Sequence, residues 1–188
     1  MKHSKFSVQL IRWQRTHGRH QLPWQNTSDP YAIWLSEIML QQTRVATVIP
    51  YYLRFLRRYP DVKSLALASL DEVLALWSGL GYYSRGRNLH RTAHLIVNKY
   101  HGKFPKKTEM IQQLPGIGRS TAAAIEVFAF GKRSAILDGN VKRVLVRYFG
   151  VRDYLGDKKT EVFLWNKAEQ LLPKNNTRLP WTYFSYPG

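Results

Sequence analysis

The chain has 188 residues and no cysteine, and its 29 lysines and arginines against 12 aspartates and glutamates give a formal net charge of +17. The lack of cysteine excludes disulfides, a zinc ribbon and a thiolate-ligated metal cluster within the chain. The charge indicates a polyanionic partner. Nucleic acid is favoured over an acidic membrane surface, because no segment reads as a basic helix that lies on a membrane.

The N-terminal stretch MKHSKFSVQL has no apolar core long enough for a signal peptide. No segment approaches the roughly 20 apolar residues that a membrane-spanning helix needs. We therefore expect a soluble intracellular protein, in the cytoplasm or associated with the nucleoid, and no membrane contact.

Apolar residues recur with a helical period along almost the whole chain, and no alternating pattern predicts a strand, so an all-α fold is expected. Ser69 and Glu72 match a capping box, Thr108 is expected to cap a short helix, and Pro50 predicts a kink or a restart within its helix. The predicted helices comprise residues 6–17, 30–40, 44–58, 70–77, 82–100, 109–114, 119–130, 141–149 and 160–172.

The stretch LPGIG, residues 114–118, stands between two of these helices. Its glycines allow positive φ and a close approach to the backbone. Freed N–H groups and the N-terminus of the next helix then form a site for phosphate, which carries no sequence information. An ordinary helical corner with a glycine cap is the alternative, but the charge of +17 favours binding to the DNA backbone. The residues expected at this contact are Leu114, Gly116, Ile117, Gly118 and Ser120.

Three further motifs accompany this turn: LSEIMLQQTRV at 35–45, LWSGLGYYSRGRNLH at 76–90 and ILDGNVKRV at 136–144. Together, over roughly residues 3–172, they resemble the helix-hairpin-helix base-excision glycosylase superfamily and, more narrowly, the MutY-type adenine DNA glycosylases. The resemblance implies two helical lobes with a DNA-binding groove between them. One is a six-helix lobe, 28–135, and the other joins 1–27 to 136–173 and is expected to be incomplete; no role is assigned to the tail, 174–188.

The implied reaction breaks the N-glycosidic bond of an adenine mispaired with guanine or 8-oxoguanine in double-stranded DNA. Two carboxyl groups with opposite roles suit such chemistry. Glu37 lies on an apolar helix, where burial would keep it protonated; the resemblance makes it the acid that protonates adenine and then helps to activate water. Asp138 would stabilise the developing cation, and Asn140 would orient Asp138 or the water. A solvated glutamate and a simple helix cap are the alternatives for the two carboxylates.

The target base must leave the duplex to be reached. The resemblance makes Gln42 and Tyr82 the wedge and stacking residues, and Tyr83 is expected in the core instead. Lys142 and Arg143 are expected to contact phosphate, unless they form a solvated basic face. Ser120 stands where the family's bifunctional members carry a lysine that forms a Schiff base, which argues for a monofunctional hydrolase.

The family's [4Fe–4S] cluster has no cysteine ligands here, so no cofactor is expected, and the domain that recognises 8-oxoguanine has no counterpart. Two alternatives explain the lack of these two features: the chain is a natural cluster-free form, or it is a truncated product. A monomer is expected. A catalytically impaired DNA-binding remnant and an endonuclease III-like glycosylase/lyase are the alternative functions.

Overall fold

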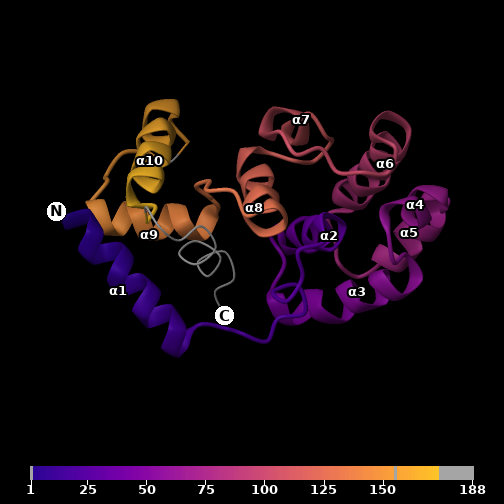
Figure 1. Ribbon diagram of the computed structural model, residues 1–188, viewed down its shortest axis with the longest axis horizontal. Helices are drawn as coiled ribbons and strands as arrows, with labels where there is room; N and C mark the ends of the chain where they lie inside the picture. The colour runs from indigo at the N-terminus through magenta and orange to yellow at the C-terminus, as the bar shows by residue number, and fades with distance from the viewer. Residues whose placement is uncertain (1, 155, 174–188) are drawn as a thin grey trace. The chain divides into compact units, whose positions relative to one another are not determined.

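Ten α-helices make up the part of the chain that the computed structural model describes, residues 2–154 and 156–173 (Figure 1). No strand occurs in these residues, so the predicted all-α fold is confirmed. None of the helices is long and apolar enough to cross a membrane. The unassigned tail, 174–188, lies outside the described residues. The helices are α1 Lys2–His17, α2 Pro30–Leu40, α3 Val45–Arg58, α4 Val62–Leu67, α5 Leu70–Trp77, α6 Tyr83–Tyr100, α7 Thr108–Gln112, α8 Arg119–Phe130, α9 Gly139–Phe149 and α10 Lys158–Leu171.

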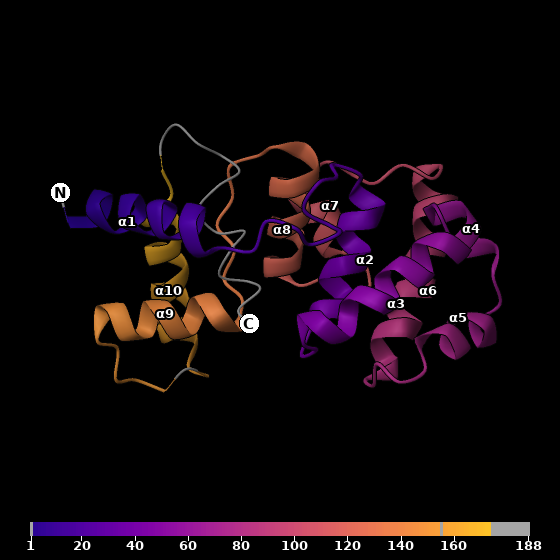
Figure 2. The same ribbon diagram turned by 90° about the horizontal axis from the view of Figure 1, so that it is seen from below.

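The helices fall into two compact units. The first, residues 21–130, contains α2 to α8. The second joins the segment up to His20 to the segment that begins at Gly131, and contains α1, α9 and α10. Within it α10 packs against both α1 and α9 (Figure 2). The buried hydroxyl of Ser7 donates a hydrogen bond of 2.5 Å to the carbonyl oxygen of Leu171, which ties the first helix to the last.

Helix α2 forms the centre of the first unit. Asp29 caps it by accepting hydrogen bonds from two backbone amides of its first turn, and Pro30 supplies its first residue, as predicted. Apolar side chains then follow all round the helix, and Trp34, Leu35 and Met39 have no exposed surface. A helix that is apolar on every side must be covered by others. It packs against α3, α6 and α8 (Figure 1).

The short helix α4 was not predicted from the sequence. Its six residues are too few to show a helical period, and its capping box pairs Asp61 with Ser64 rather than with a glutamate or glutamine. The capping box of α5, between Ser69 and Glu72, is confirmed. Other predicted helix limits differ from the observed ones by a few residues, as is usual at fraying ends.

Helix α3 continues through Pro50, so a restart of the helix at this proline is wrong. The proline removes the hydrogen bond to the carbonyl of Ala46. Both residues are exposed, so water can satisfy that carbonyl. Burial of Val48, Tyr52 and Phe55 on the opposite face holds the helix in place.

The predicted cap of α7 is also wrong. Lys107, not Thr108, occupies the position before the helix, and no side chain caps it. The hydroxyl of Thr108 instead donates a hydrogen bond to the buried carboxylate of Glu126 in α8. The helix ends at Gln112, two residues earlier than expected. This bond joins the two helices on either side of the LPGIG turn.

Candidate functional site

The LPGIG turn joins α7 to α8 as a tight hairpin. The amide of Ile117 donates a hydrogen bond of 3.1 Å to the carbonyl of Leu114, and both side chains are buried. Gly116 and Gly118 are exposed. Of the two glycines only Gly116 has a positive φ, +78°. Leu114 and Ile117 therefore anchor the turn, and the exposed backbone lies at the two glycines.

Neighbouring helices hold this turn in place. The hydroxyl of Thr92, in α6, donates a hydrogen bond of 3.0 Å to the carbonyl of Pro115. The side-chain amide of Gln41 lies 3.5 Å from the carbonyl oxygen of Gly116. A Cβ added at Gly116 would lie 3.0 Å from the Cβ of Asn88, whereas one at Gly118 would have no atom within 4 Å. The backbone at Gly118 is thus open to a partner.

Helix α8 begins directly after the turn. Its first hydrogen bond runs from the amide of Ala122 to the carbonyl of Gly118, at 2.9 Å. First-turn amides such as that of Ser120 have no acceptor within the helix, and they carry the positive end of its dipole. Ser120 is half-buried at the second position of the helix. An exposed glycine turn followed by a helix N-terminus is a geometry at which proteins bind phosphate.

Glu37 lies on the central helix α2 and is half-buried. Its neighbours Leu35, Ser36 and Ile38 are buried. The backbone of Glu37 is held in place because α2 is capped at Asp29 and packs against three other helices. A single carboxyl group is thus presented from a rigid, largely apolar element.

Gln42 and Tyr82, the predicted wedge and stacking residues, share an unusual backbone conformation. Gln42 has a φ of +56°, and Tyr82 a φ of +47° and a ψ of +56°. Left-handed backbone costs a residue with a side chain about 1–2 kcal/mol. Both side chains are exposed, Tyr82 to 59%. Such strain at exposed side chains points to a functional constraint.

The prediction that Tyr83 belongs to the core is wrong. Its side chain is 41% exposed, and its hydroxyl lies 3.4 Å from that of Ser78. Tyr83 is the first residue of α6, where the side chain points away from the packed face of the helix. The core position near this end of α6 is taken by Arg85, which is only 8% exposed.

Arg85 was not identified from the sequence. Its guanidinium donates hydrogen bonds to the carbonyls of residues 38, 39, 41, 80 and 81 and to the hydroxyl of Thr43. Burial lowers the pKa of Arg85, yet an arginine keeps its charge in proteins. One sequence signal was present: Arg85 stands on the apolar stripe of α6, in line with Leu89, Ala93 and Ile96.

The second unit carries the other predicted residues. Asp138 caps α9: one carboxylate oxygen accepts hydrogen bonds from the amides of Asn140, at 2.9 Å, and Val141, at 2.8 Å. The amide oxygen of Asn140 accepts a hydrogen bond from Arg143. Lys142 forms an ion pair of 2.9 Å with Glu161 of α10. Asp138 and Asn140 therefore lie together at the helix start, and both basic side chains already have partners.

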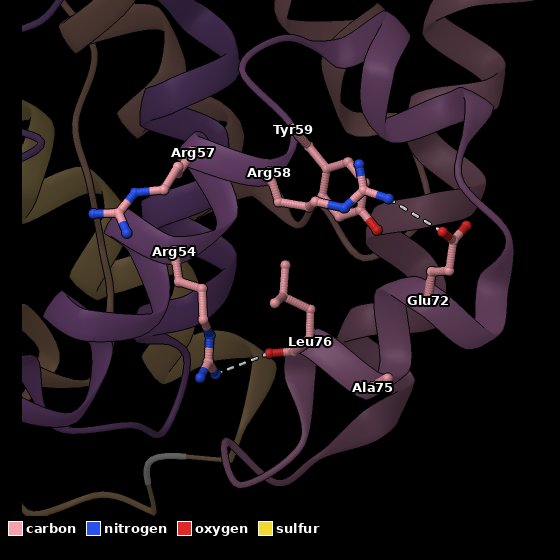
Figure 3. Close-up of a pocket in the computed structure, with 7 residues that line it drawn as sticks. All are labelled: Arg54, Arg57, Arg58, Tyr59, Glu72, Ala75 and Leu76. Atoms are coloured by element: carbon pink, nitrogen blue, oxygen red, sulfur yellow. Dashed lines mark hydrogen bonds and ion pairs between the residues drawn. The ribbon is translucent and has the colours of Figure 1, made fainter.

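A cavity of about 590 Å³ lies elsewhere in the first unit, between the end of α3 and α5 (Figure 3). Arg58 forms an ion pair with Glu72 across it, and Arg54 donates a hydrogen bond to the carbonyl of Leu76. None of the sequence-predicted site residues lines this cavity.

The sequence and the helical fold are similar to those of known proteins. A family model described as "HhH-GPD superfamily base excision DNA repair protein" matches residues 35–170. An adenine DNA glycosylase of Buchnera aphidicola subsp. Acyrthosiphon pisum is 51% identical over 172 residues, which cover 92% of this chain and 49% of the relative. A thymine/uracil-DNA glycosylase of Pyrobaculum aerophilum is 34% identical over 92% of this chain and 76% of the relative.

Among solved structures, that of a thermostable thymine-DNA glycosylase matches with a TM-score of 0.84 and 32% identity, over 93% of this chain and 80% of that one. The chain spans about half the length of the bacterial adenine DNA glycosylases that it matches. The family match covers most of the chain, including the hairpin and both candidate carboxylates. The chain belongs to the HhH-GPD superfamily of base excision DNA repair proteins.

Proposed function

We propose that the chain removes adenine from double-stranded DNA in which it is mispaired with guanine or 8-oxoguanine. The observation that carries the proposal is the 51% identity to an adenine DNA glycosylase, since it extends over 92% of this chain and so includes every candidate residue. The net charge of +17 supports a DNA partner. The chain is proposed to act as a monomer.

The hairpin binds the DNA backbone in this proposal. Exposed amides at Gly118 and in the first turn of α8 would hold a phosphate without reading sequence. Gln42 would enter the duplex from its exposed turn, and Tyr82 would stack beside the gap. Extrusion of the base costs a few kcal/mol, least for a mispaired base, and these two side chains would offset the lost stacking.

Glu37 and Asp138 divide the chemistry. Glu37 donates its proton to N7 of adenine, and the bond between N9 and the sugar C1′ breaks with its electron pair moving to the base. The carboxylate of Asp138 stabilises the positive charge that develops on the sugar. Water then attacks C1′, with Glu37 accepting its proton. The products are free adenine and an abasic site.

Ser120 explains why the strand would stay intact. A hydroxyl cannot form an imine with the sugar, so no Schiff base leads to strand cleavage. The chain contains no cysteine. Its residues therefore do not fit a cysteine-ligated iron–sulfur cluster, and every step above uses side chains of the chain itself.

The test is a base-release assay with the purified chain on duplexes that contain A:8-oxoguanine, A:G, A:T, G:T or G:U. We expect adenine release from the first two only, with strand breaks that appear after alkali. Release of thymine or uracil would show instead that the chain acts on the bases named for the Pyrobaculum aerophilum relative. Breaks without alkali would mean a lyase, and DNA binding without base release would mean a remnant.

A further inference from the structure

The buried guanidinium of Arg85 joins two separate segments of the first unit. Three of its hydrogen bonds go to carbonyls of residues 38, 39 and 41, at the end of α2, and one to the hydroxyl of Thr43. The others go to the carbonyls of Leu80 and Gly81, in the loop before α6. These distances run from 2.5 to 3.3 Å, and none of the acceptors is a carboxylate.

Each of the two segments contains one strained residue. Gln42 stands between Gln41 and Thr43, both of which accept a hydrogen bond from Arg85. The turn has the φ pattern of type II, with a bond of 3.3 Å from the amide of Thr43 to the carbonyl of Leu40. Its third position normally requires glycine. Arg85 therefore holds the chain on both sides of a side chain that occupies a glycine position.

Tyr82 directly follows Gly81, whose carbonyl accepts from Arg85. The guanidinium carbon of Arg85 also lies 5.3 Å from the centre of the Tyr82 ring, within the range of a cation–π contact. The amide of Arg85 closes the first turn of α6 onto the carbonyl of Tyr82, at 2.9 Å. The same arginine thus fixes the backbone and the ring of the second strained residue.

Stability alone does not account for this arrangement. The Nε atom of Arg85 is buried and has no hydrogen-bond partner, which is unfavourable. Burial of a charge is costly unless the charge is both paired and hydrogen-bonded, and none of the six acceptors carries a charge. Its six hydrogen bonds reach the two segments that contain Gln42 and Tyr82, which have left-handed backbone and exposed side chains.

We infer that Arg85 is a positioning residue, which holds the Gln42 turn and the Tyr82 loop in register so that both side chains enter the DNA together. The inference rests on the proposed function for what the two side chains do. The planar fork of arginine is essential to it. Nη1 donates to the carbonyls at the end of α2, while Nη2 donates to Thr43 and to the carbonyls of residues 80 and 81, so one guanidinium reaches both segments. Lysine would keep the charge but could not hold both segments at once.

The test compares Arg85→Lys and Arg85→Met with Arg91→Met, which removes an exposed arginine from the same helix. Hydrogen exchange on the free protein should show lost protection confined to residues 41–43 and 80–85 in both Arg85 variants. The fluorescence of 2-aminopurine placed at the target adenine should report impaired extrusion. Single-turnover base release should fall about 10- to 100-fold, while affinity for matched duplex stays unchanged because the hairpin is intact.

Several outcomes would overturn the inference: protection lost evenly over the first unit, activity of Arg85→Lys equal to wild type, or base release that falls only as affinity for matched duplex falls. If Arg85→Met does not fold, Arg85→Lys alone carries the comparison. The exchange experiment contains no DNA. A wild type that releases no adenine would therefore count against the proposed function, while local loss of protection would still support the role of Arg85 in the two loops.

Discussion

The hydroxyl of Thr92 donates a hydrogen bond of 3.0 Å to the carbonyl oxygen of Pro115, from the interior of one helix to the turn between two others. Thr92 has no exposed surface. This hydrogen bond satisfies the carbonyl of Pro115, which has no partner within the turn. It also holds the backbone of the hairpin in a fixed position relative to α6. The orientation of the candidate phosphate site thus depends on a residue outside the LPGIG motif.

Thr92→Val should loosen the hairpin. Valine keeps the shape of threonine but leaves the carbonyl of Pro115 without its partner, at a cost of about 1–3 kcal/mol. Urea unfolding measures that cost, and binding to matched and mismatched duplexes should weaken to the same extent. A variant that loses stability but binds DNA as tightly as wild type would show that Thr92 does not set the hairpin geometry.

Alanine substitutions at the two hairpin glycines should distinguish an effect on stability from an effect on DNA binding. Gly118→Ala has open space and no positive φ to penalise it, so the melting temperature should not fall. Gly116→Ala meets Asn88 at 3.0 Å and requires a φ of +78°, so it should lose about 1 kcal/mol or more of stability. Gly118→Ala should nevertheless weaken binding to any duplex, because its methyl group obstructs the approach of phosphate. Unchanged duplex affinity would remove Gly118 from the interface.

Most of the fold could be predicted from the sequence, because long amphipathic helices and their caps are local properties. Asp29, Ser69 and Asp138 each mark a helix start by their own chemistry, and the structure confirms all three. Helix α4 is too short to show a period. The role of Thr108 depends on Glu126, a partner 18 positions away that no local pattern reveals.

The candidate site was predictable only in part. The family resemblance indicated Gln42 and Tyr82, but not that both adopt left-handed backbone. That strain is maintained by Arg85, whose acceptors stand up to 47 positions away in sequence. An arginine within an apolar stripe is a visible signal, but it does not say what the arginine holds. The long-range hydrogen bonds of the candidate site therefore could not be predicted from local sequence patterns.

Tyr52 should make the protein sensitive to alkali. Burial, with a smaller contribution from Asp29, raises the pKa of Tyr52 to about 12 from an ordinary value of 10.0. The folded state thus holds this proton more tightly than the unfolded chain. The resulting stabilisation is fully present below pH 10 and is lost as the pH rises from about 10 to about 12.

Between pH 10 and pH 12 the free energy of unfolding should therefore fall less for Tyr52→Phe than for wild type. The difference should reach about 2 kcal/mol at pH 12. Urea unfolding at a series of pH values measures the difference. Tyr154→Phe, which removes an exposed hydroxyl in the second unit, is the matched control. Parallel curves for wild type and Tyr52→Phe would show that Tyr52 ionises equally well in the folded and unfolded states.

Glu37→Gln should abolish adenine release while DNA binding is retained. The amide keeps the shape of the side chain but cannot protonate the leaving base, and loss of a general acid typically costs about 10²–10⁴ in rate. Glu169→Gln, at an exposed position of α10, should be without effect. Single-turnover kinetics and duplex affinity are measured on the same preparations. Adenine release by Glu37→Gln near the wild-type rate would exclude Glu37 from the mechanism.

Asp138→Asn should lose activity without losing structure. The side-chain oxygen of asparagine can accept the hydrogen bonds from residues 140 and 141 that Asp138 accepts now, and the two residue types are about equal as helix caps, so stability should change by less than about 1 kcal/mol. The negative charge that faces the developing cation disappears, and removal of one such group typically costs about 10²–10³ in rate. Asp61→Asn supplies the control, because Asp61 caps α4 through a comparable bond of 2.8 Å to the amide of Ser64. Both variants should melt close to wild type, and only Asp138→Asn should be slow in single-turnover adenine release. If Asp138→Asn instead lost rate only in proportion to a fall in melting temperature, Asp138 would be a cap for α9 and nothing more.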